Sequence, residues 1–355
     1  MELYFVDRWW YLLLGMVITF VICLIVIGWP LPWKLARNFS DNIQNSHGGL
    51  ICRVGGFPIA LAAILVYGLY VFRGETSSDK TYIVILGLSC FVFLVGFLED
   101  LTSHIRPFYR VLGVCLFGVL GGFQLGWLDK LNIVLIDPYI TEWPLLAASI
   151  TIFGVVGLTN SFNLIDGLNG LCSGTALIIY AVLIYLAKRL GLEEFVFFYQ
   201  LLFFCLLGFF ICNFPSGKIF LGDGGALFLG FVIAQGCIFL NSIDSPLSSW
   251  VFVLCCIYPI WETVFSFGRR IVQKKRWSVA DRRHLHQLIY DWMSPGTDEH
   301  HSVKRNARAS SVCLVFPLVS GALSIVFYDN SLALKFACIA LISVYLFLYF
   351  FLSKK

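Results

Sequence analysis

Long apolar runs constrain this chain more than any other feature of its sequence. Hydrophobic residues make up 59% of the chain and charged residues only 13%, whereas soluble domains carry about 25% charged residues. A core formed by 355 residues could not remove this much apolar surface from water. The composition therefore excludes a soluble protein and indicates one that crosses a membrane many times.

The apolar runs are continuous, which predicts helices. A bilayer core of about 30 Å needs about 20 apolar residues per helix, whereas a transmembrane barrel would show segments of about ten residues with alternating polarity. We therefore predict an all-α polytopic membrane protein in which residues 1–355 form a single domain with about eleven spans. The spans centre on residues 10–32, 56–73, 81–98, 110–128, 143–159, 168–187, 195–214, 224–240, 249–267, 309–328 and 332–352.

The distribution of basic residues predicts the orientation of these spans. Most of the 25 lysines and arginines fall in four loops and the C-terminal tail, all on the same side of the predicted membrane. Because positive loops stay in the cytoplasm, we predict an outside N-terminus and a cytoplasmic C-terminus. The cytoplasmic loops are predicted at residues 34–55, 99–109, 160–167, 215–223 and 268–308.

Four carboxylates lie at the predicted cytoplasmic ends of spans: Glu99, Asp100, Asp166 and Asp223. Each one alone is also explained as a solvated helix end, a turn residue or a helix cap. Ionisable groups at the edge of a membrane bundle are costly to desolvate and mark functional sites. Their joint occurrence on one side of a charge-poor chain favours a site that faces the cytoplasm.

Two of these carboxylates stand in distinctive local patterns. In "NSFNLIDGLNGL" (residues 160–171), Asn160, Asn163 and Asp166 are three residues apart and would share one face of a helix. "GDGG" (residues 222–225) opens an apolar helix, so backbone N–H groups lie beside a carboxylate. Such hard oxygen ligands, without a Cys/His metal spacing, suit Mg²⁺, or alternatively Mn²⁺, and a phosphate.

The histidines and cysteines carry weaker information. His284 and His286 are two residues apart, so only an extended turn would let both face one ligand. Glu262 is interpreted as a buried residue near the cytoplasm, and Arg53 either follows the charge rule for loops or meets a phosphate. The twelve cysteines mostly lie inside apolar runs as small hydrophobic residues, without Cys-x-x-Cys pairs.

Five stretches, taken together and in this order, resemble the polyprenyl-phosphate N-acetylhexosamine-1-phosphate transferases. They are "HGGLICRVGG", "GFLEDL", "NSFNLIDGLNGL", "FLGDGGALFLG" and "DRRHLHQ", and they cover the chain from about His47 to Gln287. The resemblance implies transfer of N-acetylhexosamine-1-phosphate, most simply GlcNAc-1-phosphate, from a UDP-sugar to undecaprenyl phosphate with release of UMP. This reaction would begin a lipid-linked glycan, such as O-antigen or teichoic acid, at the bacterial inner membrane.

The same resemblance implies roles for individual residues and partners. Asp100, with Glu99 and Asp166, would be catalytic, and Asp166, Asp223 and Asp100 would hold Mg²⁺. The residues implied in substrate binding are Asn160, Asn163, Gly222, His284, His286, Arg53 and His47. The implied partners are the membrane, the lipid phosphate, the UDP-N-acetylhexosamine and, as a further option, a second copy of the chain; nucleic acid is not implied.

The sequence departs from the family pattern at three positions. Glu99 stands where the family has a first aspartate, Asn45 where it commonly has a lysine, and Gln287 where it often has a second histidine. The triple histidine of the peptidoglycan-precursor branch is absent, which favours an N-acetylhexosamine donor. A phospho-N-acetylmuramoyl-pentapeptide transferase, a transporter and a non-catalytic scaffold are the alternatives.

Overall fold

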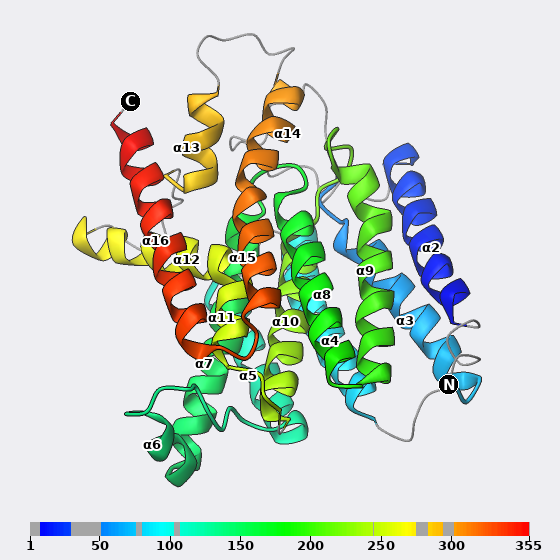
Figure 1. Cartoon of the computed structure of the whole chain (residues 1–355). Coiled ribbons are helices and arrows are strands. Elements are labelled where there is room, and N and C mark those ends of the chain that lie inside the picture. The colour runs from blue at the N-terminus through cyan, green and yellow to red at the C-terminus, as the bar shows by residue number, and fades with distance from the viewer. Residues whose placement is uncertain are drawn as a thin grey trace.

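The computed structural model describes residues 8–29, 51–75, 80–102, 107–243, 245–274, 283–293 and 302–354. All regular secondary structure in these ranges is helical, as predicted (Figure 1). The helices are α2 (Trp9–Gly28), α3 (Gly56–Phe72), α4 (Thr81–Thr102), α5 (Pro107–Leu125), α6 (Asp137–Glu142), α7 (Pro144–Ile165), α8 (Leu171–Arg189), α9 (Glu193–Asn213), α10 (Gly222–Ser242), α11 (Trp250–Cys255), α12 (Ile257–Val272), α13 (Leu285–Trp292), α14 (Ser302–Cys313), α15 (Val315–Val326) and α16 (Ser331–Ser353).

The described residues contain nine helical stretches long and apolar enough to cross a membrane, counting α14 and α15 as one. The apolar helix α3 is slightly shorter, at 17 residues. These helices coincide with the predicted apolar runs, so the chain is a polytopic membrane protein. Several extend past the predicted loop boundaries, because a polar last turn can continue a helix beyond the apolar run. The count of eleven spans and the orientation stay predictions.

The predicted ninth span, residues 249–267, is not one straight helix. It divides at Cys256 into the six-residue α11 and the sixteen-residue α12, and Figure 1 shows α12 lying crosswise to its upright neighbours. Pro259 lacks the N–H that would bond to the carbonyl of Cys255, which accounts for a break at this point. Hydropathy alone does not register the break, because the residues on both sides are apolar.

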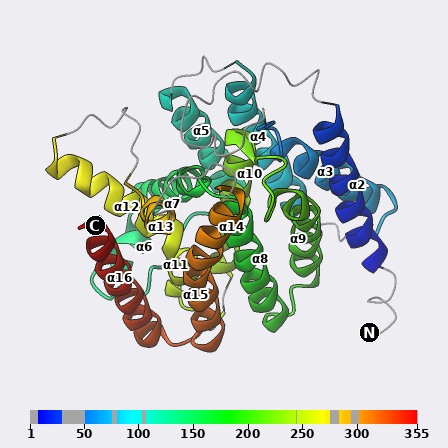
Figure 2. The same ribbon diagram turned by 90° about the horizontal axis from the view of Figure 1, so that it is seen from above.

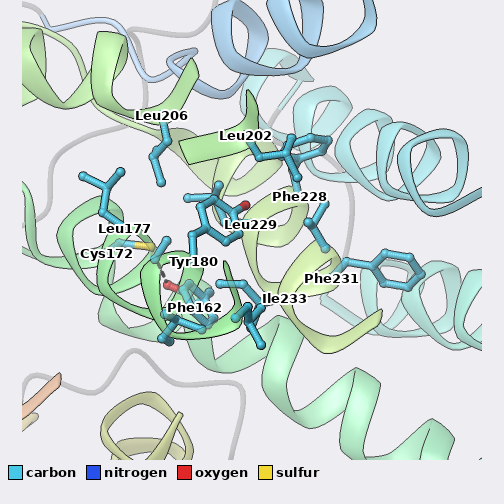
Figure 3. Packing of buried hydrophobic residues seen from close by; sticks show 14 of the residues in the cluster. Phe162, Cys172, Leu177, Tyr180, Leu202, Leu206, Phe228, Leu229, Phe231 and Ile233 are labelled. Carbon is cyan, nitrogen blue, oxygen red and sulfur yellow. Dashed lines mark hydrogen bonds between the residues drawn. The ribbon is translucent and has the colours of Figure 1, made fainter. Parts of the chain in front are cut away.

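Helix α10 lies at the centre of the bundle, packed against α3, α4, α5, α7 and α8, as the view from above shows (Figure 2). In its apolar window 89% of the residues are buried, compared with 17% for the peripheral α16. Figure 3 shows Phe228 of α10 beside Leu202 of α9, within a buried cluster that also holds Phe231, Phe162 and Tyr180. Because lipid is as apolar as these side chains, close van der Waals packing holds such helices together.

Small residues let two helices approach the first turn of α10. A Cβ at Gly96 of α4 would lie 2.7 Å from the Cα of Gly224, and a Cβ at Gly56 of α3 would lie 2.3 Å from the Cα of Gly225. Larger residues at these positions would push the backbones apart. The glycines therefore bring the end of α4 and the start of α3 against the N-terminus of α10.

A polar cluster at the opposite end of the bundle joins α2, α3 and α9; we call it the outer cluster. The guanidinium of Arg8 lies 3.5 Å from a carboxylate oxygen of Glu194. The hydroxyl of Tyr70 donates to the same carboxylate at 3.1 Å, and the hydroxyl of Tyr11 donates to Glu75 at 2.8 Å. Glu75 also pairs with Arg73 at 3.3 Å.

Candidate active site

Asp100 caps the N-terminus of α10. Its carboxylate accepts hydrogen bonds from the backbone N–H groups of Asp223, at 3.0 Å, and Gly224, at 2.9 Å. A carboxylate is favoured there because free N–H groups and the helix dipole attract negative charge. The sequence predicted that these N–H groups would meet a phosphate, but in this conformation Asp100 occupies them.

Gly222 shapes the entry to this helix. It adopts φ +78°, a left-handed conformation that side chains disfavour. A Cβ there would lie 2.2 Å from the carbonyl oxygen of Arg53 and 2.7 Å from Oδ2 of Asp100. The glycine predicted to bind substrate is thus needed to let three chain segments meet.

Asp223 is held by two arginines. Nη1 of Arg110, on α5, lies 2.7 Å from Oδ2 of Asp223 and 3.1 Å from Oε2 of Glu99. Nη2 of Arg53 lies 3.6 Å from Oδ1 of Asp223. All four side chains are largely but not fully buried. Glu99 and Asp100 are adjacent, yet Glu99 pairs with Arg110 while Asp100 caps α10.

Arg110 is the site residue that the sequence did not single out. It was counted only among the basic residues that favour a cytoplasmic loop. Its position four residues into α5 resembles that of any arginine near a helix end. Only the contact between α5 and the start of α10 identifies it as the partner of two carboxylates.

The stretch "NSFNLIDGLNGL" forms the last turns of α7 and the connection to α8. Asn160 and Asn163 lie on α7, and Asp166 is the residue directly after its end. The amide of Asn160 donates back to the carbonyl of Val156 at 2.8 Å, whereas the Nδ2 group of Asn163 is buried without a partner. An unsatisfied buried donor is costly and fits a ligand that is bound during the reaction.

Burial raises the pKa of Asp166 to about 7, although the positive charge of Arg53 opposes this rise and the charge of Asp223 adds to it. The connection after Asp166 is anchored by two side chains: Asn213 accepts from the N–H of Gly170 at 2.7 Å, and Asn306 accepts from the N–H of Asn169 at 2.7 Å.

The two histidines lie side by side. His284 precedes α13 with extended backbone angles (φ −82°, ψ 152°), and its ring stacks on that of His286 with centroids 5.5 Å apart. The extended turn that the spacing required is therefore present. A Cβ at Gly167 would lie 2.5 Å from Nε2 of His286, so this ring contacts the residue that follows Asp166.

Buried Glu262 holds His284 in place. Its Oε1 lies 3.1 Å from Nδ1 of His284 and accepts the N–H of Leu285 at 3.1 Å. Oγ of Ser266 lies 3.0 Å from the same Nδ1. Burial lowers the pKa of His286 to about 4, so its ring is neutral at physiological pH.

One predicted site residue, His47, and the departure at Asn45 lie outside the described residues. The other predicted residues gather at one end of the bundle: Glu99, Asp100, Asn160, Asn163, Asp166, Gly222, Asp223, His284, His286 and Arg53. We call these residues, together with Arg110, the site cluster.

An apolar groove of about 730 Å³ lies between helices of the bundle, and none of the residues that line it belongs to the site cluster. Its walls come from α7, α10, α11 and α12, and they include Gly157 and Leu158, which directly precede the polar stretch of α7. At the far end the groove reaches Leu131 and Ile133 in the connection between α5 and α6. The groove therefore runs along the bundle from the turn of α7 that precedes Asn160 toward the connection between α5 and α6.

The chain is similar to proteins of known families. Residues 82–241 match the family model described as "Glycosyl transferase family 4". A Bacillus subtilis protein named "Probable undecaprenyl-phosphate N-acetylglucosaminyl 1-phosphate transferase" is 28% identical over 78% of each chain. The undecaprenyl-phosphate alpha-N-acetylglucosaminyl 1-phosphate transferase of Thermotoga maritima is 28% identical over 69% of this chain and 70% of its own. The phospho-N-acetylmuramoyl-pentapeptide-transferase of Leuconostoc mesenteroides is 31% identical over 68% of this chain and 77% of its own.

Proposed function

The chain belongs to glycosyl transferase family 4, and we propose that it transfers N-acetylhexosamine-1-phosphate from a UDP-sugar to undecaprenyl phosphate. In this reaction an oxygen of the lipid phosphate bonds to the β-phosphorus of the UDP-sugar. The bond from that phosphorus to the oxygen shared with the α-phosphate breaks, and UMP leaves. The product is a lipid diphosphate that carries the sugar.

The observation that carries this proposal is the site cluster itself. Four helices (α4, α5, α7 and α10), the stretch before α3 and the segment 283–293 bring acids, arginines, amides and histidines to one end of an otherwise apolar bundle. Phosphoryl transfer depends on positioned charges that align the nucleophile and neutralise the phosphates. This cluster provides charges of both signs where a lipid phosphate could reach them from the membrane.

Arg53 and Arg110 are suited to bind phosphate oxygens. A guanidinium group binds phosphate through paired N–H donors, and these two groups approach Asp223 from different segments, Arg53 from the stretch before α3 and Arg110 from α5. A bound diphosphate would replace Asp223 as the partner of Arg53 and Arg110. The unpartnered Nδ2 of Asn163 offers a further donor to the phosphate or the sugar.

We further propose that Asp166 and Asp223 bind Mg²⁺, which would neutralise charge on the diphosphate. Carboxylate oxygens are the hard ligands that this ion prefers. Among the described residues, the carboxylates do not form a set of three ligand atoms within 4.8 Å of one another. Mg²⁺ fits this arrangement because it is usually held by one or two carboxylates plus water and substrate phosphates.

The apolar groove suits the polyprenyl tail of the acceptor. Its walls are almost entirely apolar, and two of its residues adjoin the stretch that ends in Asp166. A tail in the groove would place its phosphate beside the carboxylates while leaving the isoprene units among lipid-like side chains. The site cluster then faces the cytoplasm of a bacterial inner membrane, as the basic loops favour.

The donor is most simply UDP-GlcNAc. Two of the relatives named above are N-acetylglucosaminyl 1-phosphate transferases, and the third acts, by its name, on a muramoyl-pentapeptide. The triple histidine of the peptidoglycan-precursor branch is absent from this sequence. Gln287 instead accepts the N–H of His284 through its side chain at 3.3 Å. This arrangement favours the smaller N-acetylhexosamine donor.

UMP release by the purified protein tests the proposal. The protein receives undecaprenyl phosphate and UDP-GlcNAc with and without Mg²⁺, beside Asp166→Asn and a control, Asp129→Asn, at an exposed residue outside the cluster. We expect release that requires lipid and Mg²⁺, is lost in Asp166→Asn and persists in Asp129→Asn. UMP release only with another UDP-N-acetyl sugar would show that the donor is that sugar. No UMP release with any such donor would overturn the enzyme proposal.

A further inference from the structure

Three cysteine sulfurs meet in the interior of the bundle, at the wall of the groove. Cys237 comes from α10, and Cys255 and Cys256 from the end of α11. The three Sγ atoms lie within 4.8 Å of one another, and those of Cys255 and Cys256 are 3.6 Å apart. Among the described residues, no other three His, Cys, Asp or Glu ligand atoms come this close.

The break between α11 and α12 produces this convergence. On a regular helix, two consecutive side chains point about 100° apart. Cys256 lies at the interruption, with φ −100° and ψ 11°, and both sulfurs turn toward Cys237. A single buried cysteine would be explained as a small hydrophobic residue, but three thiols on two segments form a donor set.

The spacing matches that of a three-coordinate metal ion. Metal–sulfur distances of about 2.3 Å place three sulfurs around one ion about 4 Å apart. The present separations, 3.6 Å for Cys255 and Cys256 and no more than 4.8 Å for the other two pairs, lie within an ångström of this value. Structural zinc sites require four ligands, whereas soft thiolate donors select Cu(I).

Charge also favours a monovalent ion. Net charge is expensive in apolar surroundings, and one Cu(I) needs only one thiolate for neutrality. In that step one S–H bond breaks, its proton leaves to solvent, one S–Cu bond forms, and two thiols donate lone pairs without any change of oxidation state.

The groove supplies a route to the thiols. Cys237 lines it and is 8% exposed, while Cys255 and Cys256 are 1% and 0% exposed. We propose that Cys237, Cys255 and Cys256 form a binding site for a soft monovalent metal ion, with Cu(I) as its probe, that opens on the apolar groove. This inference does not depend on the transferase activity.

Cu(I) titration tests the site. Purified full-length protein in detergent, kept anaerobic with a phosphine reductant, competes for Cu(I) with a chromogenic chelator. The comparison is with Cys237→Ser and with Cys205→Ser, a control at an equally buried cysteine of α9. We expect one Cu(I) per chain for the parent and the control, and affinity at least 100-fold weaker for Cys237→Ser. Unchanged affinity in Cys237→Ser would overturn the proposal.

A second measurement needs no variant, which matters if Cys237→Ser fails to fold. The parent protein is treated with a small alkylating reagent with and without one equivalent of Cu(I), and mass spectrometry reads the label at Cys237. We expect Cu(I) to protect Cys237 at least tenfold and to leave half-exposed Cys90 labelled as before. Equal labelling of Cys237 in both samples would contradict the site.

Discussion

The outer cluster and the site cluster use the same residue types but differ in how their charges are balanced. In the outer cluster, Glu75 and Glu194 pair with Arg73 and Arg8, and two tyrosine hydroxyls donate to the carboxylates. The described part of the site cluster holds four carboxylates, and two of them, Glu99 and Asp223, pair with Arg53 and Arg110. Three of its buried nitrogens, Nδ2 of Asn163, Nδ1 of His286 and Nε of Arg110, have no hydrogen-bond partner.

This contrast separates a cluster that stabilises from one that acts. Satisfied polar groups in a low-dielectric setting stabilise a packed arrangement, whereas excess charge and unpaired donors cost free energy. A folded protein keeps this free-energy cost at a site where a bound ligand pairs with the charges and donors. We therefore expect substitutions in the site cluster to change activity per folded molecule, and substitutions in the outer cluster to change only stability.

The largest effect is expected for Asp223→Asn. The variant removes a charge that we assign to the metal and that holds both arginines, so UMP release should fall about 1,000-fold. The matched outer variant, Glu194→Gln, should keep activity within about threefold per folded molecule. The kinetics of UMP release by detergent-purified protein measure the activity of both variants. Equal losses of activity in the two variants would contradict the proposed difference between the clusters.

Arg110→Ala should have the next largest effect. It leaves Glu99 and Asp223 without their closest cation and removes a phosphate donor, so kcat/KM should fall about 100-fold. Arg110→Lys should recover only part of this loss, because lysine keeps the charge but lacks the planar pair of donors. The control is Arg8→Ala in the outer cluster; activity unchanged in Arg110→Ala would remove Arg110 from the site.

Glu262→Gln should lower activity about 10- to 100-fold, because Glu262 positions His284 without reaching the substrate. The double variant with His284→Gln should be no worse than the worse single variant if the two act as a unit. The kinetic double-mutant cycle gives this coupling. Fully additive losses would show that Glu262 acts independently of His284.

The smallest effect on activity is expected for Tyr70→Phe. It deletes the hydroxyl that donates to Glu194, so the free energy of unfolding should drop by about 1 kcal/mol while UMP release stays unchanged. Unfolding in detergent, followed by circular dichroism, measures the stability. A loss of activity at unchanged stability would show that the outer cluster reaches the reaction.

The site could be predicted from sequence where its residues lie on one segment. The three-residue spacing of Asn160, Asn163 and Asp166 indicated one shared face if the segment were helical, and Asn160 and Asn163 do lie on α7, which ends at Ile165 inside the predicted loop. The two-residue spacing of His284 and His286 required an extended turn, which His284 adopts. In both cases backbone geometry within a few residues decides the outcome.

The site could not be predicted where partners come from different segments. Adjacent Glu99 and Asp100 diverge because one meets α5 and the other meets α10. Glu262 was interpreted only as a buried residue near the cytoplasm, and it is buried, but its bond to His284 crosses 22 residues of chain. The cysteines lack metal spacing in sequence, yet three of them meet because α11 ends beside α10.

The sequence by itself determined that this chain is a helical membrane protein with its polar residues gathered in a few short stretches, because hydropathy and local spacing are properties of neighbouring residues. Only the tertiary structure decided that Asp100 caps α10, that Arg110 joins the site and that α12 turns crosswise. These outcomes depend on how closely helices pack, and glycines such as Gly96 and Gly224 allow that approach. Contacts between distant segments leave no periodic pattern in the chain, so they appear only once the helices are assembled.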